Sequence, residues 1–308
     1  MCTQCKVNIL LSTYNGEQYL AQQLDSLLNQ TYPNIHIYIR DDGSSDRTLN
    51  IIHEYISNHT NITFINTPDD HNLGYMKSFW TLLNYDDSAD YYSFCDQDDV
   101  WLPNKVELGV KVLETLSEHS TPMLYSSSFQ YCDENLNVTG NPINLPERIH
   151  LKDVLFYTPA FGFTILINKA LRNAALCSPS HRDYPHDSWC QKIAASMGIF
   201  YHDSTITALY RRHSSTVTYA ASSNMKLIRK WIKNDIFGNM LDNNHNTIYH
   251  YLQDYKKKLS PEQKKLLSCF ASQPFNLKTY ATRLFFPHRL RPSLGGELAL
   301  RICFLLGK

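Results

Sequence analysis

The stretch of the sequence with the clearest chemical potential is DQDD, residues 96–99, which places three carboxylates within four positions. It directly follows YYSFC (91–95), an apolar and aromatic run that is typical of a buried strand. Neighbouring carboxylates repel one another and are costly to desolvate, so they persist mainly where a cation or a ligand offsets the repulsion. Asp96 and Asp98 can offer oxygen ligands to one hard cation, Mg²⁺ or Mn²⁺. A solvated acidic turn is the alternative on this pattern alone.

The elements that must position DQDD alternate between strands and helices. Short apolar runs that indicate strands recur at 7–12, 35–40, 62–67 and 91–95. Between them, leucine, isoleucine or aromatic residues repeat at helical spacing in segments near 20–28, 49–56 and 75–84. We expect Ser44 and Ser45 to cap the second of these helices. The alternation predicts an α/β fold with a mostly parallel central sheet that is covered by helices on both faces.

Polar clusters follow three of these four strands. STYNG (12–16) comes after the first strand, RDDGSSD (40–46) after the second and DQDD after the fourth. Asp, Asn, Gly and Ser also dominate ordinary turns, so each cluster alone has a purely conformational explanation. Ligands of parallel sheets bind outside the carboxyl ends of the strands, however, and three clusters at this one edge favour a ligand site.

The remainder of the chain has a more mixed pattern. Strands are expected at 122–132 and 161–168, a helix at 186–198 and an extended segment at 199–218. From residue 221 the pattern becomes helical, and Ser260 with Gln263 forms a capping-box signature. We therefore predict a catalytic domain at 1–220 and a helical, basic region at 221–308.

Composition limits the possible classes of function. The 308 residues are 43% hydrophobic and carry no formal net charge, which indicates a globular protein and argues against nucleic acid as a partner. Residues 221–308 nevertheless hold 15 Lys and Arg against 5 Asp and Glu. The eight scattered cysteines and the lack of a secretory signal predict a reduced, cytoplasmic setting, and no apolar run is long enough to span a membrane.

The motifs taken in order resemble a known family. STYNG, RDDGSSD, NLG (72–74), DQDDVW (96–101), HDSW (186–189) and YRRHSS (210–215) are together similar to the inverting family 2 glycosyltransferases, which have the GT-A fold. DQDDVW beside STYNG and RDDGSSD resembles the bacterial rhamnosyltransferases among them. The resemblance covers residue 7 to about residue 218. It implies a nucleotide-sugar donor, either dTDP-rhamnose or a UDP-sugar, and a glycan or lipid-linked glycan as acceptor.

The resemblance also implies roles for the residues that hold the donor nucleotide. Ser12 and Tyr14 would hold the base, with the Tyr14 ring stacked on the pyrimidine. Asp41 would accept a hydrogen bond from the base, and Asp96 would contact the ribose. Each of these residues lies in one of the matching motifs.

A second set of implied roles concerns the cation and the diphosphate. Asp98 would bind the metal with Asp99 as support, and His213 would approach the metal or the diphosphate. Arg211 could pair with phosphate, although exposed arginines without such a role are common. Trp101 would help to shape a partly dry site.

Asp187 is the candidate catalytic base. An inverting transfer needs one carboxylate to accept the proton of the acceptor hydroxyl. The alternative is an aspartate that only favours the dipole of its own helix. His186 could tune Asp187 or bind the acceptor.

Two rival functions remain open from the sequence. D-Q-D-D-V (96–100) also fits the signature of haloacid-dehalogenase-like phosphatases, with Asp96 as the nucleophile. Three predicted strands precede it, whereas that signature normally closes the first strand. A non-catalytic protein that binds sugar nucleotides is the other rival.

The last segment, residues 277–308, interleaves Arg and Lys with Leu and Phe. This pattern suits peripheral contact with an anionic membrane, here the inner face of the cell membrane. An ordinary amphipathic helix packed on the catalytic domain is the alternative.

Overall fold

The structure is a computed structural model. It describes residues 5–67, 71–116, 120–213, 238–273 and 276–307. The domain boundary predicted near residue 220 lies outside these residues.

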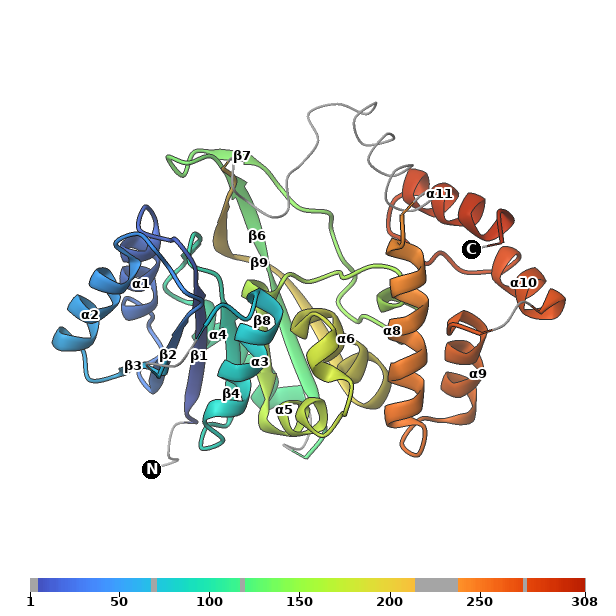
Figure 1. Cartoon of the computed structure of the whole chain (residues 1–308), viewed down its shortest axis with the longest axis horizontal. Coiled ribbons are helices and arrows are strands. Elements are labelled where there is room, and N and C mark those ends of the chain that lie inside the picture. Colours follow the sequence, from blue (N-terminus) through green and yellow to red (C-terminus); the bar gives the residue numbers. More distant parts are fainter. Residues whose placement is uncertain (1–4, 68–70, 117–119, 214–237, 274–275, 308) are drawn as a thin grey trace.

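One sheet of nine strands forms the centre of the described part of the chain (Figure 1). The strands are β1 (Val7–Thr13), β2 (Ile35–Asp41), β3 (Ile62–Phe64), β4 (Tyr91–Cys95), β5 (Val100–Trp101), β6 (Met123–Cys132), β7 (Val138–Gly140), β8 (Ile165–Asn168) and β9 (Ile199–Arg211). Their order is β3-β2-β1-β4-β8-β6-β9-β5, with β7 paired to β6. The strands β1 to β4, β6 and β9 share one direction, while β5, β7 and β8 oppose it. The prediction of a mostly parallel sheet is therefore confirmed.

Helices flank this sheet and extend beyond it at the C-terminal side (Figure 1). They are α1 (Leu20–Leu28), α2 (Thr48–Asn58), α3 (Tyr75–Tyr85), α4 (Lys105–Leu116), α5 (Lys169–Leu176), α6 (His186–Met197), α8 (Met240–Tyr255), α9 (Pro261–Phe270), α10 (Leu277–Leu284) and α11 (Leu294–Leu305). Short 3-10 turns are η1 (Leu151–Val154), η2 (Gly162–Thr164) and η3 (His181–Asp183). The predicted capping box at the start of α9 is present, with Ser260 accepting from the Gln263 amide.

Two local expectations were wrong. The strand predicted from residue 161 begins only at Ile165, because η2 occupies the three residues before it. The predicted serine cap of α2 is absent among the described contacts: Ser44 donates its hydroxyl to Asp41, and Asp46 accepts from the Thr48 amide at 3.0 Å. Asp46, which lies two residues before the start of α2, therefore accepts from the first amide of the helix.

The C-terminal helices share a hydrophobic core with the N-terminal part of the chain. Trp189 of α6 is fully buried against two tyrosines of α8, with ring centroids 5.4 Å from Tyr251 and 6.2 Å from Tyr255. Leu300 and Phe304 of α11 belong to the same buried cluster. Every helix in the described residues is too short or too polar to cross a membrane.

Candidate active site

A large cleft opens at the carboxyl ends of β1 and β4 and continues past the start of α6 to one face of α8. Its volume is about 1490 Å³. The side chains that line it include seven of the eleven predicted site residues: Ser12, Tyr14, Asp96, Asp98, His186, Asp187 and His213. The other four, Asp41, Asp99, Trp101 and Arg211, are buried around it and do not line it.

Asp98 and His213 meet across the cleft wall. The Nε2 atom of His213 lies 2.8 Å from Oδ2 of Asp98, and both side chains are largely screened from solvent. The histidine ring also packs against Tyr19, with ring centroids 5.0 Å apart. The end of β9 and the DQDD loop are therefore joined through two groups that can each bind a metal.

The carboxylates of DQDD strongly affect one another. Burial raises the pKa of Asp96, and the charges of Asp98 and Asp187 raise it further. Burial likewise raises the pKa of Asp99, whose Oδ1 accepts from the Arg211 amide at 3.2 Å. Such carboxylates gain stability from a bound cation, because it favours their charged form.

Arg211 is committed to holding this loop in place. Its guanidinium donates to the backbone oxygens of Asp98 (2.9 Å) and Glu134 and to the side-chain oxygen of Gln22. It also lies 4.4 Å above the centre of the Tyr19 ring. Arg211 therefore supports the DQDD loop, and its pairing with phosphate stays a prediction.

Trp101 lies behind the loop and fills the core. It is 2% exposed, and Lys105 Nζ lies 4.8 Å from its ring centre. Burial lowers the pKa of Lys105 to about 7. Trp101 shapes the site from outside, since it does not reach the cleft.

Gln97, the second residue of DQDD, is a site residue that the sequence analysis missed. Its side-chain oxygen accepts from the Tyr14 amide and its side-chain nitrogen donates to the Tyr14 carbonyl, both at 2.8 Å. Gly16 leaves room for this clamp, because a Cβ there would lie 2.3 Å from Gln97 Oε1. The clamp fixes the backbone of the loop after β1, while the Tyr14 ring stays 51% exposed in the cleft and open to stacking.

Asp41 and Asp42 at the end of β2 have different surroundings. Asp41 is buried and accepts from the Thr13 hydroxyl and from two amides of its own turn, at 2.8 to 3.0 Å. Asp42 pairs with Arg40 at 2.6 Å and is the one of the two that lines the cleft. The Asp41 carboxylate is therefore occupied in shaping the turn, where Gly43 takes a φ of +88°.

Asp187 lies in the first turn of α6 and lines the cleft. Burial raises its pKa to about 6, while the Ser188 amide and the charge of Lys192 act in the opposite direction. The Lys192 ammonium donates to the Ser188 hydroxyl at 2.7 Å. A carboxylate that titrates near neutral pH beside an open cleft is suited to accept a proton from a bound hydroxyl.

His186 is wedged between two aromatic rings. Its ring centroid is 4.3 Å from that of Phe79 and 4.2 Å from that of Phe94. Burial lowers its pKa to about 3, so the imidazole is neutral. Gly162 permits this packing, since a Cβ there would lie 2.7 Å from Nε2 of His186.

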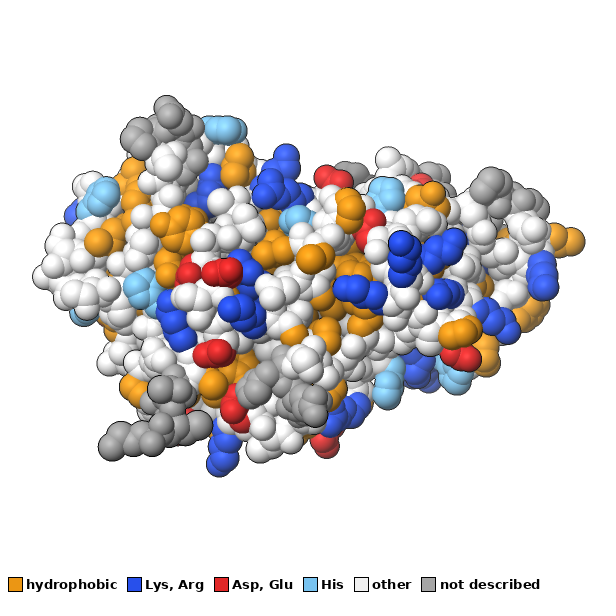
Figure 2. Space-filling view, turned by 90° about the horizontal axis from the view of Figure 1, so that it is seen from below, with side chains coloured by type: hydrophobic (Ala, Val, Ile, Leu, Met, Phe, Trp, Pro, Cys, Tyr) orange, Lys and Arg blue, Asp and Glu red, His pale blue; other side chains and the backbone are white. Residues whose placement is uncertain are grey.

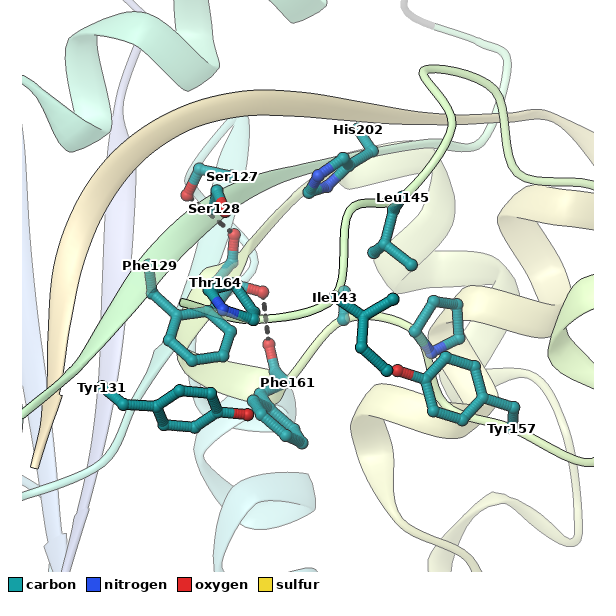
Figure 3. A pocket seen from close by; sticks show the side chains of 13 residues that line it. Ser127, Ser128, Phe129, Tyr131, Ile143, Leu145, Tyr157, Phe161, Thr164 and His202 are labelled. Carbon is teal, nitrogen blue, oxygen red and sulfur yellow. Dashed lines mark hydrogen bonds between the residues drawn. The ribbon is translucent and has the colours of Figure 1, made fainter. Parts of the chain in front are cut away.

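A small pocket adjoins the cleft and shares Phe161 with it (Figure 3). Thr164 donates its hydroxyl to the Phe161 carbonyl at 2.8 Å, and the aromatic rings of Phe129 and Tyr131 form part of the wall. Its volume of about 60 Å³ leaves room for only a few water molecules. The large cleft is therefore the candidate ligand site.

The large cleft is lined by acidic side chains. None of the described residues that line it is lysine or arginine. Five are aspartates: Asp42, Asp96, Asp98, Asp183 and Asp187. A diphosphate could enter such a cleft only if another positive charge accompanied it.

The chain belongs to glycosyl transferase family 2. Residues 8–173, more than half of the chain, match the sequence pattern of this family. It is therefore a glycosyltransferase with a GT-A-type fold. Membership of this family rules against the phosphatase alternative, in which Asp96 would be a nucleophile. It also agrees with the resemblance that the ordered motifs carry.

Two relatives and one solved structure illustrate the likeness. The dTDP-rhamnosyl transferase RfbG of Shigella flexneri is 36% identical over 33% of this chain and 36% of its own length. WfgD of Escherichia coli, a UDP-Glc:alpha-D-GlcNAc-diphosphoundecaprenol beta-1,3-glucosyltransferase, is 22% identical over 80% of this chain and 90% of its own. The fold matches S. aureus TarS 1-349 in complex with UDP-GlcNAc, with a TM-score of 0.57, 15% identity and coverage of 97% and 89%.

Proposed function

We propose that this glycosyltransferase moves rhamnose from dTDP-rhamnose onto a hydroxyl of a cell-surface glycan, with inversion and with the help of Mn²⁺ or Mg²⁺. The observation that carries the proposal is the acidic cleft, which Asp96, Asp98 and Asp187 line and whose described lining includes no lysine or arginine. The partial similarity to RfbG supports the rhamnose donor. A UDP-sugar is the competing donor, as in the names of WfgD and the TarS complex.

The residues present fit a divalent cation. Asp98 and His213 would hold it, with Asp96 beside them, and the cation would stabilise the negative charge of the departing diphosphate. The described residues contain no group of three or more His, Cys, Asp or Glu arranged for a metal. Two protein ligands are nevertheless enough for Mg²⁺ or Mn²⁺ when substrate phosphates and water supply the rest.

Asp187 would act as the base. It would accept the proton of the acceptor hydroxyl as that oxygen bonds to the anomeric carbon and the bond from this carbon to the diphosphate oxygen breaks. The nucleoside diphosphate leaves with the electron pair. Because the His186 ring is neutral, it would add no positive charge beside this carboxylate.

The first test is calorimetric binding of dTDP-rhamnose, UDP-glucose, UDP-galactose and UDP-N-acetylglucosamine, each with Mn²⁺ or with chelator. We expect one donor to bind in a metal-dependent way. Asp98→Ala should abolish the part of the affinity that depends on metal. Asp183→Ala is the matched control, because it removes one negative charge from the same cleft outside DQDD. Equal metal dependence in the Asp98 variant and the intact protein would remove Asp98 from the metal site.

We also propose peripheral contact with an anionic membrane through α10 and α11. Exposed apolar side chains gather there: Leu277, Phe285, Leu294, Leu298, Ile302, Leu305 and Leu306. Figure 2 shows Lys and Arg side chains beside apolar ones over the right-hand part of the molecule, where the C-terminal helices lie. The guanidinium groups of Arg283 and Arg301, however, donate hydrogen bonds to backbone carbonyls of the same region.

Sedimentation with vesicles of phosphatidylglycerol and phosphatidylcholine tests this contact. Removal of residues 277–308 would also take Leu300 and Phe304 out of the core, so point substitutions are preferable. Leu298→Ser with Phe285→Ser should weaken sedimentation with anionic vesicles, whereas Ile143→Ser, at a similarly exposed site elsewhere, should not. Absence of binding by the intact protein would end the membrane proposal.

A further inference from the structure

The face of α8 that borders the cleft is rich in uncharged polar groups. Its lining residues are Met240, Asn243, Asn244, Asn246, Thr247 and His250. The opposite face, with Leu241, Ile248 and Tyr251, is buried in the core. Neither the family match, which ends at residue 173, nor the motifs of the sequence assign a role to this polar face.

The size of the cleft leaves space for a second ligand beside the nucleotide sugar. Pockets for one small ligand usually measure roughly 300–1,000 Å³. The cleft, at about 1490 Å³, exceeds that range and extends from Tyr14 at one end to α8 at the other.

The base connects the two ends of the cleft. Asp187 lines the same cleft as Asp96, which lies on the donor side. On the other side, the Tyr184 hydroxyl and Nδ1 of His250 are 2.6 Å apart, and this contact joins the segment before α6 to the polar face of α8. The reacting hydroxyl of an acceptor would therefore lie between DQDD and α8.

The chemistry of the α8 face selects neutral, hydroxyl-rich ligands. Each asparagine amide offers donors and an acceptor, which match sugar hydroxyls that both donate and accept. The side chains of Asn243 and Asn246 are exposed. No lysine or arginine lies among the described residues of this wall, so a phosphate there would lack the permanently charged partner that lysine or arginine provides.

We propose that the polar face of α8 is the acceptor subsite and that it binds the terminal neutral sugar of the acceptor glycan. The inference rests on the proposed function. It adds that recognition is directed at sugar hydroxyls, while any phosphate of a lipid-linked acceptor lies outside this wall.

The test uses saturation-transfer NMR with p-nitrophenyl glycosides of glucose, galactose, N-acetylglucosamine and rhamnose, in the presence of the nucleotide selected by the donor panel. Asn243→Ala combined with Asn246→Ala should weaken glycoside binding about tenfold or more, because at least two hydrogen bonds are lost. Gln253→Ala is the matched control, since it removes an exposed amide of α8 that does not line the cleft. Calorimetric donor affinity should be equal in all three proteins.

The outcomes separate this inference from the proposed function. Glycoside binding that is absent in the intact protein or equal in the double variant would overturn the α8 subsite, while donor binding would still support the transferase. Tighter binding of glucose 1-phosphate than of the neutral glucoside would also overturn it. A protein that binds glycosides through α8 but none of the donors would contradict the proposed function alone.

Discussion

Replacement of Arg211 by lysine separates two roles for this residue, support of the DQDD loop and direct contact with phosphate. The buried guanidinium serves three acceptors, on Asp98, Glu134 and Gln22, and lies over the Tyr19 ring. A lysine ammonium can satisfy at most one of the three in the same space. We therefore expect a loss of at least two hydrogen bonds to a charged donor.

The expected loss of stability is large for a single charged-to-charged substitution. Two such bonds at about 1.5 kcal/mol each give about 3 kcal/mol, against a typical total of roughly 5–15 kcal/mol. The corresponding fall in melting temperature is about 6 °C or more at about 2 °C per kcal/mol. Denaturant unfolding followed by tryptophan fluorescence measures the free energy of unfolding directly.

Arg212→Lys is the matched control. The guanidinium of Arg212 lies 3.5 Å from the centre of the Tyr131 ring, and its buried Nε has no hydrogen-bond partner among the described residues. We expect a loss below about 1 kcal/mol, because lysine keeps part of the attraction to the ring. An Arg211→Lys variant with unchanged unfolding and a sharply lower donor affinity would refute the reasoning and would restore Arg211 as a phosphate ligand.

Three further predictions concern the proposed base Asp187, the loop after β1 and the fold. With the metal saturating, turnover should fall about tenfold per pH unit below the Asp187 pKa of about 6, since the carboxylate must be ionised to accept a proton; a flat profile down to pH 5 would mean another base. Asp187→Asn should retain donor affinity and lose transfer. Gln97→Ala removes both bonds to the loop after β1 and should weaken donor binding roughly tenfold, measured by calorimetry; unchanged affinity would show that the clamp is dispensable. Gly198→Ala brings a Cβ within 1.8 Å of a backbone oxygen and should cost more than about 3 kcal/mol, whereas Gly140→Ala, with open space around it, should be nearly neutral in the same unfolding assay.

The sequence predicts the repeated strands and helices well because their apolar residues follow simple periods. The runs at 7–12 and 35–40 correspond to β1 and β2, and the expected helix at 186–198 corresponds to α6. The insertion of β8 antiparallel between β4 and β6 has no local signal, since it depends on which edges remain unpaired after the parallel half is complete. The position of η2 depends in the same way on tertiary packing.

The candidate site was predictable where residue type alone determines the chemistry. Aspartates at the carboxyl ends of strands mark a cation or substrate site, and seven predicted residues do line the cleft. The roles of Asp41 and Arg211 depend on their hydrogen-bond partners, and those of the Arg211 guanidinium lie more than seventy residues away along the chain. The polar face of α8 was missed because its asparagines are ordinary residues of an exposed helix until the fold brings them to the cleft.

The aromatic contact between α6 and α8 restricts how this protein can diversify. A chain that ended before α8 would leave Trp189 facing water, so residues 5–213 are not expected to persist as a stable fragment. A different set of C-terminal helices could replace the present one only if its side chains packed against the aromatic residues of α6. New ligand preferences would arise more easily through single substitutions of the α8 side chains that line the cleft, because these do not change the contact between α6 and α8.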